Sequence, residues 1–165
     1  MQLRQGKRRG VLLLLLALAA TAGSGCAPRK IPGTEIDDTT DTRAVLDVVN
    51  AYRVAVEQRS AQAILELADE SFRDDGGSAN PEDDLDYRAL GTTLAARLEK
   101  VRDVRLDVTV RKIEFDDDSR RARVTYSYQL SFKMPEYTGR AQTETDIKQM
   151  TLRRVEKGWK ITSGI

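Results

Sequence analysis

Histidine is absent from this sequence and cysteine occurs only once, so two common sources of catalytic and metal-binding groups are missing. Without histidine the chain has no Ser-His-Asp triad, no Cys-His pair and no histidine-ligated zinc or iron site. Any acid–base chemistry would depend on Asp, Glu, Tyr or Lys side chains. We therefore expect neither a metal nor another cofactor.

A strongly basic surface is also missing once the N-terminus is set aside. Arg4, Lys7, Arg8 and Arg9 precede a hydrophobic run, and no acidic residue does. The rest of the chain has 23 basic residues against 26 acidic ones, a net charge of −3. Because nucleic-acid binding needs a basic patch or stripe, we expect no nucleic-acid partner.

The first 25 residues have the three parts of a secretory signal. Residues 1–10 are basic, residues 11–20 are an uninterrupted apolar run, and residues 21–25 are small. The apolar run is shorter than the roughly 20 residues that a membrane-spanning helix needs, which disfavours a transmembrane anchor. Residues 1–25 are therefore predicted to be a signal peptide.

The signal leads into Gly23-Ser24-Gly25-Cys26, which resembles the lipobox of bacterial lipoproteins, with Gly23 in place of the usual leucine. The resemblance implies that Cys26 is acylated with palmitate-like chains and becomes the first residue of the mature protein. Two or three such chains anchor a protein almost permanently, at about 0.8 kcal/mol for each buried methylene. The alternative is an ordinary cleaved signal followed by a free thiol.

The residues after the cysteine bear on location and on domain boundaries. Ala27 is not an aspartate, so the lipoprotein resemblance implies a periplasm-facing outer-membrane location in the cell envelope. Residues 26–40 contain two prolines and a glycine after Cys26 and are predicted to be the lipidated cysteine and a flexible tether. Residues 41–165 are predicted to be one domain.

The strongest structural pattern lies in residues 122–134, where apolar and polar residues alternate. Side chains of a strand point to opposite faces with a period of two, so this stretch predicts an antiparallel strand with one buried face. The apolar positions are Ala122, Val124, Tyr126, Tyr128, Leu130, Phe132 and Met134.

Three further strands are predicted around that one. Residues 104–115 form a strand whose apolar parity changes at Arg111-Lys112, which indicates a β-bulge. Residues 142–155 form another, in which Ile147, Met150 and Leu152 indicate a second change of parity. A short turn at Glu156-Lys157-Gly158 leads to the last strand.

Three helices are predicted before the strands. Asp41 is the expected N-cap of an amphipathic helix of about 17 residues, and Ser60 that of a shorter helix. The third helix is expected to start at Asn80-Pro81-Glu82-Asp83, because proline and acidic residues favour a first turn. The fold class is therefore α+β, with helices packed on a curved antiparallel four-stranded sheet.

This order of elements, with Leu67-Ala68-Asp69, then Phe72, and a closing Gly158-Trp159-Lys160-Ile161, resembles the cone-shaped, cystatin-like fold of the nuclear transport factor 2-like superfamily. That superfamily includes ketosteroid isomerases, SnoaL-like cyclases and non-catalytic binding modules. The resemblance implies a pocket at the open end of the cone. Homodimerisation through the open sheet face is common in the superfamily and is an open alternative here.

The resemblance assigns candidate site residues. Tyr52 and Asp75 fall near the tyrosine donor and the aspartate base of ketosteroid isomerases, whereas the protonated acid of their oxyanion hole has no counterpart. Tyr52 also fits an ordinary core position, and Asp74 and Asp75 beside two glycines fit a turn. The candidate pocket residues are Tyr52, Tyr126, Tyr128 and Trp159.

These observations predict a lipid-anchored envelope protein whose domain binds a small apolar molecule or another envelope protein without catalysis. The first alternative is an isomerase- or cyclase-like enzyme with Asp75 as base and Tyr52 as donor, which requires both side chains to face one cavity. The second is a purely structural envelope component whose pocket is filled by its own side chains.

Overall fold

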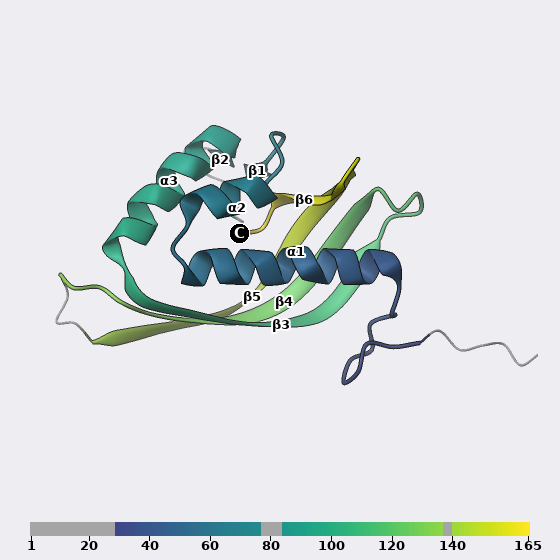
Figure 1. The fold of residues 1–165 in the computed structure, drawn as a ribbon, viewed down its shortest axis with the longest axis horizontal. Coiled ribbons are helices and arrows are strands. Elements are labelled where there is room, and N and C mark those ends of the chain that lie inside the picture. The colour runs from purple at the N-terminus through teal and green to yellow at the C-terminus, as the bar shows by residue number, and fades with distance from the viewer. Residues whose placement is uncertain (1–28, 77–83, 137–139) are drawn as a thin grey trace, which may run out of the picture.

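The computed structural model describes residues 29–76, 84–136 and 140–165, and within them it has three helices and a four-stranded antiparallel sheet (Figure 1). Two very short strands form a separate pair between the second and third helices. The elements are α1 (Thr40–Glu57), α2 (Ala61–Leu67), β1 (Arg73–Asp74), β2 (Leu85–Asp86), α3 (Tyr87–Lys100), β3 (Arg102–Phe115), β4 (Arg121–Lys133), β5 (Ala141–Val155) and β6 (Gly158–Ser163).

The large sheet has the order β3-β4-β5-β6, so each strand pairs with its neighbour in sequence. The predicted alternation in β4 is confirmed, because Ala122, Val124, Tyr126 and Phe132 are buried on one face. The bulge in β3 is also confirmed by a shift in register between Val110 and Lys112. The expected α+β class, with helices on a curved sheet, is therefore correct.

The second predicted change of parity is wrong. β5 pairs with β4 without interruption from Arg153 to Ala141. Met150 is buried, whereas Ile147 has the opposite parity and is 57% exposed. Ile147 is therefore an apolar residue on the outer face of the sheet. The irregularity in this part of the sheet lies instead where β5 meets β6, after Thr151.

Two helix starts differ from the prediction. The N-cap of α1 is Thr39, whose hydroxyl accepts from the backbone N–H of Thr42 at 3.0 Å, and not Asp41. Asp41 instead pairs with Arg154 of β5 at 2.5 Å. Ser60 caps α2 as expected, by accepting from Ala63 N–H.

The third helix begins later than predicted. Residues 80–83 lie outside the described residues, but Leu85 and Asp86 form β2, and α3 begins only at Tyr87. Its N-cap is Asp86, whose carboxylate accepts from Ala89 N–H at 2.8 Å. The helix therefore begins after the capping Asp86, directly before its apolar positions, and not at the proline-containing start that the sequence predicts.

The helices lie on the concave face of the curled sheet, with α1 crossing it and α2 and α3 further out (Figure 1). The main core cluster joins α1 to the sheet through residues such as Val45, Val124 and Ile161. Among the described residues, the buried hydrophobic side chains run from Ile36 to Ile161. Residues 29–165 thus contain a core that joins the described helices to the sheet, and we expect them to fold on their own.

The described part of the predicted tether, residues 29–39, has a local fold. Lys30 and Asp37 form an antiparallel bridge and an ion pair at 2.7 Å, and Ile36 is buried. The tether predicted over residues 26–40 therefore has a short structured segment directly before α1.

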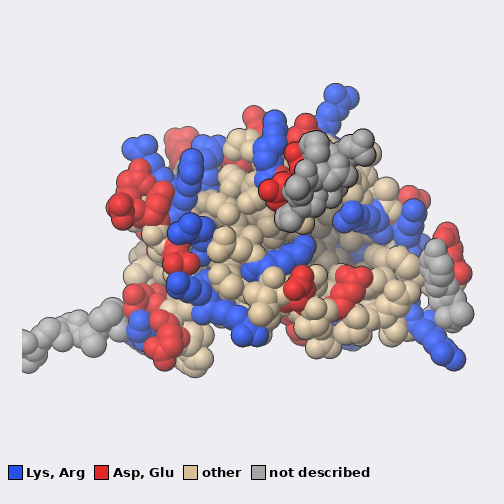
Figure 2. All heavy atoms as spheres, turned by 180° about the vertical axis from the view of Figure 1, so that it is seen from behind, with Lys and Arg blue, Asp and Glu red and all other residues tan. Residues whose placement is uncertain are grey.

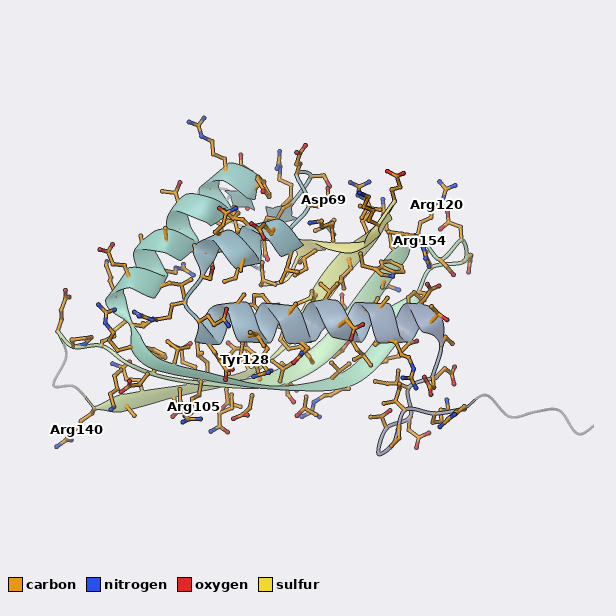
Figure 3. All side chains as sticks on the ribbon, in the orientation of Figure 1. Asp69, Arg105, Arg120, Tyr128, Arg140 and Arg154 are labelled. Atoms are coloured by element: carbon orange, nitrogen blue, oxygen red, sulfur yellow. The ribbon has the colours of Figure 1, made fainter. Side chains whose placement is uncertain are left out.

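Ion pairs fix the region around α2 to the sheet. Asp69, which is labelled in Figure 3, is 6% exposed. Its carboxylate accepts from Ser71 and from Arg153 of β5, the latter at 2.5 Å. Burial alone would raise the pKa of Asp69, but the hydrogen bonds from Ser71 and Arg153 outweigh it and lower the pKa.

Elsewhere, as Figure 2 shows for one face, basic and acidic side chains are interspersed.

Candidate functional site

A cavity of about 540 Å³ lies between the concave face of the sheet and the helices. Its walls are mostly apolar, and its residues come from all three helices, from β2, β3, β4 and β5, and from the C-terminal segment. The apolar and aromatic residues that line it are Tyr52, Val56, Ile64, Leu85, Leu90, Leu94, Leu98, Val101, Val104, Leu106, Tyr126, Tyr128, Leu130, Phe132, Met134 and Ile165.

The position of α3 explains why this space is not filled. α3 packs on α2 and follows β2, and it stands off from the four-stranded sheet. A Cβ atom at Gly91 of α3 would lie only 3.0 Å from Leu65 Cδ1, so glycine permits the close approach of the two helices. As a result, Tyr128 and Leu130 have the inward parity of β4 but remain only half-buried.

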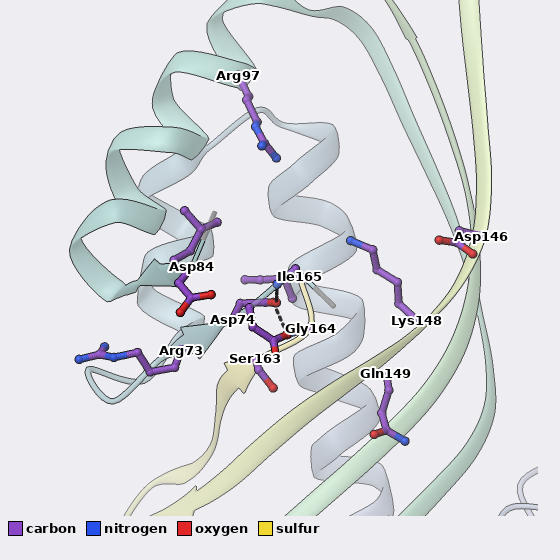
Figure 4. A pocket seen from close by; sticks show the side chains of 13 residues that line it. Arg73, Asp74, Asp84, Arg97, Asp146, Lys148, Gln149, Ser163, Gly164 and Ile165 are labelled. Carbon is purple, nitrogen blue, oxygen red and sulfur yellow. Dashed lines mark hydrogen bonds between the residues drawn. The ribbon is translucent and has the colours of Figure 1, made fainter. Parts of the chain in front are cut away.

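The cavity adjoins a larger polar hollow of about 860 Å³, which we call the mouth. Leu85, Arg97, Lys148 and Ile165 line both spaces. Figure 4 shows Arg97 and Lys148 extending into this space from α3 and β5. The remaining residues of the mouth are Arg73, Asp74, Asp75, Gly76, Asp84, Asp146, Gln149, Ser163 and Gly164.

Tyr52, a predicted site residue, lines the inner cavity from α1. Burial raises the pKa of Tyr52 to about 12, with smaller contributions from Tyr128 and the Asp74 carboxylate. The hydroxyl is therefore protonated at neutral pH and is available as a donor. Among the described residues, no hydrogen bond to the Tyr52 hydroxyl is found.

Asp75, the predicted base, is exposed and lines the mouth, whereas Tyr52 lines the inner cavity. The structure therefore does not place these two side chains in one cavity. The neighbouring Asp74 is half-buried and points inward. Its two carboxylate oxygens accept from Gly76 N–H at 3.0 Å and from Gly164 N–H at 2.7 Å (Figure 4).

The predicted pocket residues are brought together only in part. Tyr126 and Tyr128 line the cavity with Tyr52, and the Tyr126 hydroxyl donates to the Gly164 carbonyl at 2.9 Å. Burial raises the pKa of both Tyr126 and Tyr128. Trp159 does not line the cavity. Trp159 packs against Phe115, and the Arg154 guanidinium lies 4.6 Å from the centroid of the Trp159 ring.

Two predictions concern features outside this site. Cys26 and the apolar run at residues 11–20 lie outside the described residues, so lipidation stays a prediction. In the part of the chain that the structure describes, no helix is long and apolar enough to cross a membrane. No three His, Cys, Asp or Glu side chains in that part are grouped as a metal site requires.

Comparison with known proteins identifies the architecture. No protein-family model matches the chain, and no curated protein matches it. Among solved structures, it is similar to a nuclear transport factor 2-like superfamily protein from Salmonella enterica, with a TM-score of 0.64, 11% identity and coverage of 76% of this chain and 88% of that one. The chain has the nuclear transport factor 2-like fold.

Other structures with the nuclear transport factor 2-like fold carry names of enzymes. A ketosteroid isomerase-like protein from Erwinia carotovora has a TM-score of 0.62 and 12% identity over 77% of this chain and 95% of its own. A provisionally named dehydratase from Streptomyces avermitilis has a TM-score of 0.60 and 17% identity over 76% of this chain and 94% of its own. At such identities the likeness concerns the fold, which does not determine the chemistry.

Sequence reasoning missed two residues of this nuclear transport factor 2-like domain, Arg97 and Lys148, which lie where the cavity meets the mouth. One signal was present in the sequence: Lys148 has the same parity in β5 as the buried Met150 and Leu152. A lysine at a core-facing position indicates a wet space there. Arg97 follows Leu90 and Leu94 at helical spacing and has no comparable signal.

Proposed function

We propose that this protein is a cell-envelope lipoprotein, anchored through Cys26, whose domain binds a small apolar molecule without catalysis. The observation that carries the binding role is the cavity of about 540 Å³ with mostly apolar walls. Small-molecule sites are typically concave, mostly apolar and roughly 300–1,000 Å³ in volume. The lipid anchor rests on the sequence around Cys26 alone.

The placement of the carboxylates favours binding over catalysis. A general base must reach the proton that it removes, directly or through one water. Asp75 lines the mouth and not the inner cavity, so a ligand held by the apolar walls lies away from it. Asp74 is closer, but both of its oxygens already accept backbone N–H groups, and protonating either would weaken one of these bonds.

One observation favours the enzymatic alternative. Tyr52 presents a hydroxyl that is protonated at neutral pH to the cavity, as a donor to a substrate carbonyl would. In this alternative Tyr52 is the donor and Asp75 the base of an isomerase- or cyclase-like reaction. Isomerisation of a β,γ-unsaturated ketosteroid that is abolished by both Tyr52→Phe and Asp75→Asn would support it. Turnover unaffected by either substitution would reject this pair.

The binding role is tested with residues 29–165, which contain the complete core. We expect native mass spectrometry to detect a retained small molecule, and an apolar fluorescent dye to bind to the emptied protein. Leu94→Trp places an indole in the cavity and should abolish dye binding. The matched control is Ala96→Trp on the exposed side of α3, which should bind dye normally.

Two outcomes would contradict the proposal. Dye binding that survives Leu94→Trp would place the dye outside the cavity. A protein that retains no small molecule and binds no dye would favour a role in binding another envelope protein, or a purely structural role. Neither outcome bears on the proposed anchor through Cys26.

A further inference from the structure

Two basic side chains mark the boundary between the apolar cavity and its mouth. Arg97 comes from α3 and Lys148 from β5, and both line both spaces. Figure 4 shows them approaching the same space from opposite walls. A molecule that occupies the cavity and reaches toward solvent would therefore pass between these two cations.

Neither cation has a carboxylate partner among the described residues. Lys148 Nζ lies 5.8 Å from the centroid of the Tyr128 ring, and no ion pair joins Lys148 or Arg97 to a described acidic group. By contrast, Arg153 and Arg154 on the same strand each pair with an aspartate at 2.5 Å. In the part of the chain that the structure describes, Arg97 and Lys148 thus have no ion-pair partner that a ligand would have to displace.

Among the described residues, basic side chains outnumber acidic ones in the lining of the inner cavity. Arg97, Lys100 and Lys148 line it, against the one acid Glu144. The described acids of the mouth are Asp74, Asp75, Asp84 and Asp146, and two of these four already accept backbone N–H groups. Asp74 accepts from Gly76 and Gly164, and Asp146 accepts from its neighbour Ile147 at 2.7 Å.

We infer that the ligand is an amphiphile with a carboxylate headgroup, whose apolar body fills the cavity and whose carboxylate is bound between Arg97 and Lys148. This inference rests on the proposed binding function and names the class of ligand. Charge-assisted hydrogen bonds are the strongest that such a site offers, and low-dielectric walls on one side strengthen them further. The planar guanidinium of arginine also matches the two oxygens of a carboxylate.

The test compares three probes with the same alkyl chain and different headgroups: decanoate, decanol and decylamine. Their affinities for residues 29–165 are measured by calorimetry and by displacement of the apolar dye. We expect decanoate to bind about tenfold or more tightly than decanol, and decylamine to bind most weakly. Raising the salt concentration should weaken decanoate binding and leave decanol binding unchanged.

Charge-removing variants assign the headgroup site. Arg97→Gln/Lys148→Gln should reduce decanoate affinity about tenfold while leaving decanol affinity unchanged. The matched control is Arg105→Gln/Lys157→Gln, which removes two cations from exposed positions outside the site: Arg105 on the outer face of the sheet (Figure 3) and Lys157 in the β5–β6 turn. It should leave both affinities unchanged.

The outcomes separate this inference from the proposed function. If decanol or decylamine binds as tightly as decanoate, and Leu94→Trp abolishes that binding, the cavity is a binding site and the carboxylate inference is wrong. A decanoate affinity that is equal in the Arg97→Gln/Lys148→Gln variant and the unaltered protein would also overturn it. If the dye binds but none of the three probes does, only this inference fails, whereas a protein that binds neither the dye nor the probes and retains no small molecule would contradict the proposed function as well.

Discussion

At the scale of single residues, the surroundings of a side chain determine its role more than its chemical type does. Asp74 and Asp75 are adjacent carboxylates, yet Asp74 is held by two backbone amides and Asp75 is exposed. Tyr52 and Tyr126 both face the cavity, but only Tyr126 donates to a described backbone carbonyl. The Tyr52 hydroxyl is therefore a donor that the inner wall presents to a ligand.

The raised pKa of Tyr52 predicts a loss of stability at high pH. An unfolded tyrosine titrates near 10, whereas burial holds the pKa of Tyr52 at about 12 in the folded protein. Between these values the unfolded state releases its proton and the folded state keeps it. The free energy of unfolding should therefore be fully retained below pH 10 and then fall by about 1.4 kcal/mol for each pH unit up to about pH 12.

Urea unfolding from pH 9 to pH 12 measures this effect, with Tyr52→Phe as the comparison. The variant should match the unaltered protein near neutral pH and lose stability less steeply above pH 10. Some slope should remain in the variant, because burial raises the pKa of Tyr126 as well. Equal slopes in the two proteins would show that Tyr52 does not titrate as proposed.

How far single residues could be predicted depended on whether the signal was local. Tyr52 and Tyr126 line the cavity, and each lies on the apolar face that the spacing of its own element predicts. Which of Asp74 and Asp75 is held by the backbone could not be predicted, because it depends on Gly164, which lies 90 positions beyond Asp74. Trp159 has the buried parity of β6 but packs on Phe115 and does not line the cavity.

At the scale of elements, the segment after β6 connects parts of the site that are distant in sequence. Gly164 donates through its N–H to Asp74 and accepts through its carbonyl from the Tyr126 hydroxyl. Its φ of +88° favours glycine, and a Cβ there would overlap the Gln149 carbonyl oxygen and lie 2.7 Å from Met150 Cα. Glycine thus allows the segment to lie directly on β5.

Gly164→Ala should consequently destabilise the protein more than Gly158→Ala does. Both positions have positive φ, which costs an alanine about 1–3 kcal/mol, but a Cβ at Gly158 meets open space. The overlap at Gly164 should add about 1–3 kcal/mol and release Asp74 and Tyr126 from their partners. Urea unfolding of both variants measures the difference. Equal losses in the free energy of unfolding would show that the overlap of the added Cβ with β5 does not destabilise the protein.

Elements were predictable where a repeating pattern extended over many residues. The β4 alternation and the β3 bulge each rest on several positions, and both were correct. The prediction of a helix start depends on only one or two residues. The N-caps of α1 and α3 are Thr39 and Asp86, and not the predicted starts at Asp41 and at residues 80–83. The single residue Ile147 misled the interpretation of β5, because an exposed isoleucine has no local signature that distinguishes it from a buried one.

At the scale of the whole molecule, the order of elements predicted the fold and the resemblance implied a pocket, but the volume of the cavity could not be predicted. Its volume depends on how far α3 stands from the sheet, and α3 packs on α2, where Gly91 allows a close approach to Leu65. The apolar residues that line the cavity have the same spacing as residues that fill a core. Periodicity therefore identifies which side chains point inward, and only packing determines whether they meet.

The division between anchor and domain leads to the last prediction. The described core lies within residues 29–165, and Cys26 precedes it in the sequence. In a double-membraned bacterium, the full chain should incorporate labelled palmitate, and its mature form should begin at an acylated residue 26. Cys26→Ser should remove the label, whereas Ser24→Ala, which keeps a small residue before the cysteine, should retain it.

Intact-protein mass spectrometry distinguishes the alternatives, because an unmodified Cys26, or a mature terminus at another residue, would indicate an ordinary cleaved signal. Because the acyl chains would not contact the core, the lipidated protein and residues 29–165 should unfold at the same temperature.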